Sequence, residues 1–303
     1  MNLLPAPTPP VLDSDDPRTR LAGRIKDALR ALPAYFSSKT SIEGLAVTDL
    51  FSLNTLLAST IEVQVVETLN RMRSVWDPED EWPLYSFERQ AQTFPDVLLR
   101  KPASDGDSEV ALGIELKGWY VLAKEGVPSF RYTVTPGACA DWDLLAVVPW
   151  HLENVLAGTP RVGIPSVFSA KYAAEYRNFW WRCKRSSRSD TTIEMPTDAR
   201  PYDRRDHTSD RPVSDTGGNF GRIARIGIMQ EWIEEQQRVH IAGIPARNWF
   251  EFIRLHADQS DPQGVYDQLV ERAEAASRSV QTPAAASTLE ALQRLLQTLP
   301  PHD

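Results

Sequence analysis

Apolar residues recur every three or four positions in two stretches near the start of the chain, which is the spacing of one face of a helix. The first stretch predicts a helix over residues 19–32, closed by Pro33. The second predicts a longer helix over about residues 49–75, ending in an acidic turn at residues 77–81. The apolar positions of this longer helix are Leu57, Ala58, Ile61, Val65, Leu69 and Met72.

Three strands are predicted after these helices, at residues 82–89, 93–100 and 109–120. Turn-forming residues at 104–108 separate the last two strands, so we expect them to form an antiparallel hairpin. A fourth segment, at residues 143–149, is almost continuously apolar. That pattern is typical of a central strand buried on both faces.

The second half of the chain is predicted to be mostly helical, apart from a long polar loop at residues 184–220. The chain therefore divides into a flexible tail (1–18), a main domain (19–256) and a helical C-terminal extension (257–303). The predicted helices of this half are 166–183, which is rich in aromatic residues, 223–239, 247–256, 262–278 and 287–298.

Composition narrows the classes of protein that fit. The net charge of −8 over 303 residues counts against a broad basic surface for nucleic acid. The two cysteines form no disulfide framework, and no histidine lies near them at zinc-site spacing. No run of about 18 apolar residues predicts a membrane span, and the N-terminus does not resemble a secretory signal. We therefore expect a cytoplasmic protein.

The strand at residues 109–120 carries the most informative polar residues. Side chains alternate faces along a strand, so Glu115 and Lys117 project together, beside the small residues Ala111 and Gly113. A carboxylate and an ammonium on a face of small residues fit an active site with room above the sheet. An exposed salt bridge of little consequence is the alternative interpretation.

Asp96 favours the active-site interpretation. It follows Pro95 in an apolar segment, where a charge is costly unless it is paired or binds a metal. The predicted hairpin can bring Asp96 beside Glu115, and a divalent cation would relieve the repulsion between the two carboxylates. Magnesium accepts oxygen ligands and also binds phosphate groups, which is what phosphodiester hydrolysis requires.

The sequence contains a pattern that resembles the PD-(D/E)xK motif of the restriction-endonuclease-like nuclease superfamily. The pattern is Pro95-Asp96, followed by eighteen residues and then by Glu115-Leu116-Lys117. The resemblance implies an α/β fold with an α-β-β-β-α-β core at residues 49–150, a central mixed sheet flanked by helices, and additional C-terminal helices. It implies that Asp96 and Glu115 bind Mg²⁺, with Mn²⁺ able to substitute, and that Lys117 assists the nucleophile. The second core helix should fall between Lys117 and Asp143, where prolines and glycines require it to be short or irregular.

The superfamily often adds an acidic residue from the first core helix, and two glutamates are candidates. Glu62 borders the apolar face of the predicted helix, whereas Glu67 lies among polar residues and has Arg71 one turn later. We therefore favour Glu62 as the accessory metal or water ligand. The alternative is a glutamate at the edge of the core that extends to solvent.

The resemblance also implies double-stranded DNA as the substrate, cleaved by a restriction or phage-defence enzyme. A homodimer would place two sites on two strands. Residues 160–256 would then contact DNA, and Lys171 and Arg185 are candidates for backbone contacts. His151 is explained more simply by packing against Trp150 than by catalysis. Two alternatives stay open: a non-catalytic DNA-binding or assembly subunit with a nuclease-like fold, and a nuclease that acts on RNA.

Overall fold

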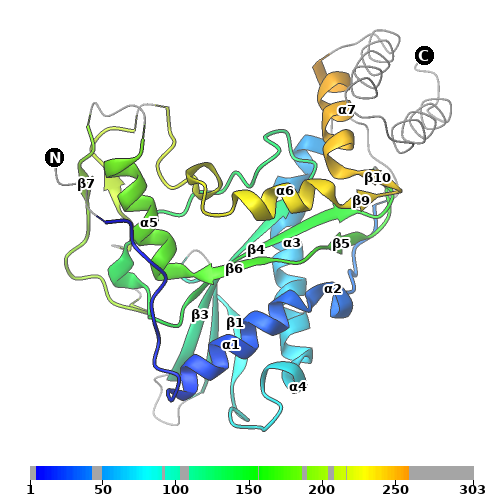
Figure 1. Cartoon of the computed structure of the whole chain (residues 1–303). Helices are drawn as coiled ribbons and strands as arrows, with labels where there is room; N and C mark the ends of the chain where they lie inside the picture. Colours follow the sequence, from blue (N-terminus) through cyan, green and yellow to red (C-terminus); the bar gives the residue numbers. More distant parts are fainter. Residues whose placement is uncertain are drawn as a thin grey trace.

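The structure is a computed structural model, and it describes most of the main domain (Figure 1). The described residues are 5–42, 50–90, 93–102, 109–155, 157–185, 190–203, 208–215 and 217–258, with the side chains of 50–56 and 255–258 excepted. The turn at 104–108 and the helices predicted at 262–278 and 287–298 lie outside these residues.

The centre of the molecule is a six-stranded mixed sheet in the order β1-β2-β3-β4-β5, with β6 also paired to β4. The first three strands are antiparallel neighbours, β4 runs parallel to β3, and β5 and β6 run antiparallel to β4. The strands are β1 (Ser86–Arg89), β2 (Val97–Lys101), β3 (Glu109–Tyr120), β4 (Leu144–Leu152), β5 (Pro160–Val162) and β6 (Ser166–Ser169).

Helices flank this sheet, so the mixed α/β class predicted from the sequence is confirmed (Figure 1). The α-helices are α1 (Pro17–Arg30), α2 (Leu32–Tyr35), α3 (Leu50–Arg71), α4 (Arg73–Trp76), α5 (Ala170–Cys183), α6 (Gln230–Arg238) and α7 (Ala246–Asp258). The described residues also form two short two-stranded sheets. One pairs β7 (Ile193–Glu194) with β8 (Arg211–Pro212), and the other pairs β9 (His240–Ile241) with β10 (Ile244–Pro245). Two 3₁₀ turns are η2 (Pro136–Ala138) and η3 (Ile223–Ile226).

Two helices cover opposite faces of β3. A Cβ placed on Gly118 would lie 3.5 Å from the Ala58 backbone of α3, so this helix approaches the sheet closely at that glycine. The next residue, Trp119, points the other way, and its ring centroid lies 5.4 Å from that of Trp232 on α6. Both faces of the central strands are therefore buried, as predicted for β4, in which eight of the nine residues are buried.

Three predicted helices have different boundaries in the structure. Residues 166–169 are not helical, because they pair with β4 as β6, and the Ser169 hydroxyl then accepts a hydrogen bond from Tyr172 N at 3.2 Å and caps α5. The helix predicted at 223–239 is divided by Gly227, which has a φ of +87°. The first helix begins inside the predicted tail, at Pro17, because the Asp16 carboxylate caps it through Arg18 N at 2.7 Å.

The expected second core helix is missing from the connection between β3 and β4. This connection is fully described and contains one 3₁₀ turn (η2) and no α-helix. Its backbone is instead held by Arg177 of α5, whose Nη1 donates to Tyr132 O at 2.8 Å and to Val134 O at 2.9 Å. Arg177 thus donates hydrogen bonds to backbone carbonyls that would have accepted them from backbone N–H groups if this connection had formed a helix.

Candidate active site

Strand register brings Asp96 and Glu115 together. Val97 at the start of β2 pairs with Ile114 of β3, so Asp96 lies opposite Glu115, one residue beyond the end of the ladder. Asp96 N donates to Glu115 Oε2 at 3.3 Å, and Leu116 N donates to Asp96 Oδ2 at 3.2 Å. The hairpin geometry expected from the sequence is therefore confirmed at these two residues.

Lys117 joins the two carboxylates. Its Nζ lies 2.7 Å from Asp96 Oδ2 and 2.9 Å from Glu115 Oε1. Glu115 and Lys117 reach the same point because they are two positions apart on one strand. We call Asp96, Glu115 and Lys117 the acidic–lysine cluster.

The open edge of β3 explains why a carboxylate from α3 lies next to this cluster. Beyond the end of β2, the N–H groups of Leu116 and Gly118 point to the edge where no strand follows, and each needs an acceptor. Leu116 donates to Asp96, and Gly118 donates to Glu62 Oε1 at 3.2 Å. Asp96 and Glu62 therefore line the same strand edge, although they are 34 positions apart in the sequence.

The two glutamates of α3 differ as the helix-face argument predicts. Glu62 is 17% exposed and has a second contact, with Arg89 Nη2 at 3.6 Å from its Oε2. Glu67 is 44% exposed and forms an ion pair with Lys39 at 2.7 Å. The prediction that Glu62 faces inward and Glu67 faces solvent is confirmed.

Burial shifts the protonation of these groups. It raises the pKa of Glu115 to about 7, because the Lys117 charge, which lowers this pKa, offsets burial only in part and Asp96 adds to the rise. Burial also raises the pKa of Glu62. For Lys117 burial acts in the opposite direction, but Glu115 and Asp96 outweigh it and raise its pKa, so its ammonium stays protonated.

The chemistry of this cluster fits a divalent cation. Within the described part of the chain, no three His, Cys, Asp or Glu side chains are already arranged as metal ligands, and the Lys117 ammonium lies between the Asp96 and Glu115 carboxylates. Burial raises the pKa of Glu115 although the Lys117 charge opposes the rise, so a further cation at this carboxylate would stabilise its ionised form. Asp96 and Glu115, with Glu62 beside them, supply the carboxylate oxygens that Mg²⁺ accepts.

The space expected above the small residues of β3 is filled at Gly113. A Cβ there would lie 2.3 Å from Pro95 Cγ and 3.1 Å from Asp143 Oδ1. Asp143 is fully buried and accepts hydrogen bonds from Gly113 N (2.7 Å), Ala140 N (2.8 Å) and the Tyr202 hydroxyl (2.6 Å). Sequence reasoning missed this carboxylate, whose only signal was a charge directly before an apolar strand.

The two residues predicted to contact DNA are engaged within the protein. Lys171 Nζ pairs with Asp141 Oδ1 at 2.7 Å. Arg185 is buried, its guanidinium stacks on the Trp181 ring at 3.7 Å, and its Nη2 donates to Asp190 O at 2.6 Å. Arg185, a candidate for a DNA backbone contact, is therefore buried in this structure, and the Trp181 ring four residues before it covers the guanidinium.

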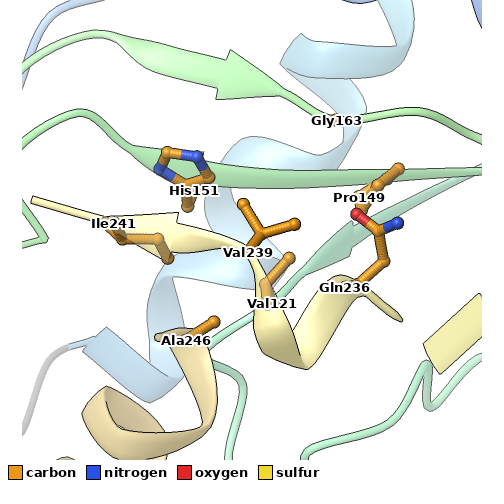
Figure 2. Close-up of a pocket in the computed structure, with 8 residues that line it drawn as sticks. All are labelled: Val121, Pro149, His151, Gly163, Gln236, Val239, Ile241 and Ala246. Carbon is orange, nitrogen blue, oxygen red and sulfur yellow. The ribbon is translucent and has the colours of Figure 1, made fainter. Parts of the chain in front are cut away.

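A cavity of about 20 Å³ lies farther along the sheet, near His151. Figure 2 shows His151 of β4 among apolar side chains that include Val121, Val239 and Ile241. Burial lowers the pKa of His151, and its Nδ1 lies 2.9 Å from Leu152 O. The volume suits about one water molecule, so this cavity is too small for a substrate and packing explains the histidine.

Comparison with known proteins found no matching family model, curated protein or solved structure. Among the described residues there is no helix with the length and apolar character needed to cross a membrane. The acidic–lysine cluster is therefore the feature of the molecule that indicates a function.

Proposed function

We propose that this protein is a magnesium-dependent endonuclease that hydrolyses phosphodiester bonds of double-stranded DNA, of the restriction or phage-defence kind. The observation that carries the proposal is the acidic–lysine cluster at the end of a β-hairpin, with Glu62 on the same strand edge. In this arrangement two carboxylates meet at a protonated lysine, and a third carboxylate, Glu62, bonds the next free N–H of the same strand edge.

The order of elements supports the same proposal. A helix, α3, precedes three antiparallel neighbours, β1, β2 and β3, and β4 then adds in parallel to β3. This sequence of elements is similar to the α-β-β-β-α-β core of the PD-(D/E)xK superfamily, except that a 3₁₀ turn replaces the second helix. Asp96 and Glu115 occupy the motif positions within it.

The residues divide the chemistry between them. When bound, magnesium supplies Lewis-acid stabilisation of the phosphoryl oxygen. Asp96 and Glu115 would hold the cation, with Glu62 as the accessory ligand, and Mn²⁺ would substitute. Glu115 and Asp96 raise the pKa of Lys117, so Lys117 would act as a donor that orients the attacking water or stabilises charge on the phosphoryl group.

Cleavage of a supercoiled plasmid tests the proposal. We expect the wild type to cut DNA with Mg²⁺ or Mn²⁺ and to be inactive with EDTA. Asp96→Ala and Lys117→Ala should each reduce cleavage by at least about a hundredfold. Glu62→Gln should reduce it while Glu67→Gln, on the same helix but exposed, should match the wild type. Equal cutting by the wild type and both alanine variants would show that the assignment is wrong.

The second candidate is a non-catalytic DNA-binding or assembly subunit with a nuclease-like fold. One observation favours it: the carboxylates of Asp96 and Glu62 already satisfy the free N–H groups of β3, which is a structural role. In that case the wild type binds DNA without cutting it. A parallel incubation with RNA separates the DNA and RNA substrates, and the oligomeric state during cleavage tests the expected homodimer.

A further inference from the structure

Arg89 lies beside the acidic–lysine cluster but belongs to no part of the sequence motif. It is the last residue of β1 and pairs with Val97 of β2. The next residue, Gln90, donates its N–H to Asp96 O at 2.7 Å. The chain thus fixes Arg89 next to the loop that carries Asp96, and its side chain reaches toward Glu62 of α3.

The contact between Arg89 and Glu62 leaves much of the guanidinium available. The Nη2–Oε2 separation is 3.6 Å, and the Arg89 side chain is 37% exposed. Within the described part of the chain, Glu62 is its one ionic partner. By comparison, Arg100 on the neighbouring strand donates from both Nε and Nη2 to Glu88. A guanidinium has five N–H donors in a fork that matches phosphate oxygens, so Arg89 retains donors for a ligand.

The charges of the site indicate what that ligand is. The ionised carboxylates of Asp96, Glu115 and Glu62, with the cations Lys117 and Arg89, leave one negative charge. A divalent cation changes this to one positive charge, which one phosphodiester neutralises. Without Arg89, the site with its divalent cation bound would have no net charge, so it would not attract the negatively charged phosphodiester.

We propose that Arg89 binds a non-bridging oxygen of the phosphodiester that is cleaved, and that Glu62, its present partner, would be one of the residues that hold the divalent cation. This inference rests on the proposed function. Arg89 on β1 and Lys117 on β3 would then both contact the phosphate, and Asp96, Glu115 and Glu62 would hold the cation. The guanidinium stabilises negative charge that increases on the phosphoryl oxygens during the reaction.

A merely structural Arg89, which only holds the Glu62 carboxylate in position, makes the opposite prediction for metal affinity. If Arg89 positions Glu62, its removal should weaken metal binding. If Arg89 is a substrate-binding cation next to a metal ligand, its removal takes away a repulsive charge, and metal binding should become tighter, by on the order of fivefold. Metal affinity measured without DNA therefore separates the two roles.

The test uses Arg89→Ala and Arg89→Lys in the full chain, with Arg100→Ala as the matched control from the same hairpin. Mn²⁺ affinity is measured by calorimetry without DNA, and plasmid cleavage with Mg²⁺ is measured under single-turnover conditions. For Arg89→Ala we expect tighter Mn²⁺ binding and cleavage slower by about a hundredfold. Arg89→Lys should be intermediate, since it keeps the charge but loses the fork, and Arg100→Ala should match the wild type.

Two results would overturn the inference: weaker Mn²⁺ binding by Arg89→Ala, or cleavage by both Arg89 variants at the rate of Arg100→Ala. If the wild type binds Mn²⁺ and cuts DNA in these experiments, only the role of Arg89 fails. If the wild type neither binds Mn²⁺ nor cuts DNA, the proposed function is wrong and the inference fails with it.

Discussion

Glu115 is the residue whose environment says most about the site. Its carboxylate is buried on the central strand, beside a second carboxylate and a lysine, and its pKa is raised to about 7. A buried structural ion pair normally has enough positive charge to keep its carboxylate ionised at neutral pH. Here burial outweighs the opposing effect of Lys117 and raises the pKa of Glu115, so a divalent cation held beside this carboxylate would favour its ionised form.

This shift predicts a pH-dependent affinity for Mg²⁺. A carboxylate must be ionised to act as a ligand, and Glu115 is mostly protonated at pH 6 and mostly ionised at pH 8. Affinity measured by calorimetry should therefore rise by about tenfold from pH 6 to pH 8. Glu67→Gln should keep this dependence, whereas Glu115→Gln should remove it. An affinity that does not change between the two pH values would contradict the argument.

Local patterns were sufficient to group four residues of the site. Strand parity placed Glu115 with Lys117, the hairpin placed Asp96 beside them, and the helix face selected Glu62 over Glu67. Arg89 was missed because its position depends on where β1 ends relative to β2, which no local pattern specifies. The burial of Arg185 had a local signal, since Trp181 four residues earlier could have indicated stacking.

At the scale of elements, the contact between the Pro95 loop and β3 determines the position of Asp96 relative to the strand. Gly113 is the point of closest approach, because Pro95 and Asp143 occupy the space where a side chain would lie. Asp143 also bonds Gly113 N, at the strand edge opposite the one that Asp96 and Glu62 line. The site therefore depends on a glycine at this position of the strand.

Gly113→Ala should destabilise the protein by about 1–3 kcal/mol, because its Cβ forces Pro95 or β3 to move. Gly23→Ala is the control: Gly23 is exposed in the interior of α1, nothing lies within 4 Å of its added Cβ, and alanine favours helix, so we expect a gain of about 0.5–1 kcal/mol. Urea denaturation measures both. Equal stability of the two variants would show that the loop contact is not tight.

The bounds of β3 and the hairpin of β2 and β3 were predicted correctly, whereas β1 and β2 each begin four residues later than expected. The elements missed were those set by distant partners. Residues 166–169 form β6 because β4 offers them an edge, although their own pattern continues into the helix. The connection from β3 to β4 needs no α-helix because Arg177, more than 40 residues later, holds its carbonyls.

At the scale of the whole molecule, one buried ion pair joins segments that are far apart in the sequence. Arg177 of α5 contacts Asp210, and both side chains are almost completely buried. Asp210 also accepts from Asn178 Nδ2 at 2.7 Å. Burial lowers the pKa of Arg177 to about 10, although Asp210 acts against this, so the guanidinium remains charged at neutral pH. The pair fastens α5, the β3–β4 connection and residues 208–215 together.

Asp210→Ala should destabilise the protein by about 3–5 kcal/mol, because it leaves the Arg177 charge buried without its partner. Glu153→Ala, which breaks the exposed pair with Arg161, should change stability by less than about 1 kcal/mol. Both are measured by urea denaturation. A small effect of Asp210→Ala would mean that water reaches Arg177 and that the connection is held by other contacts.

The most direct measurement for the central claim is a crystal structure of the protein grown with Mn²⁺, with anomalous diffraction to locate the ion. We predict one strong anomalous peak between the Asp96 and Glu115 carboxylates, with Lys117 Nζ displaced from its present place between them and Glu62 at or next to the ion. A structure at saturating Mn²⁺ in which Lys117 still bridges Asp96 and Glu115, with no ion at either carboxylate, would contradict the account.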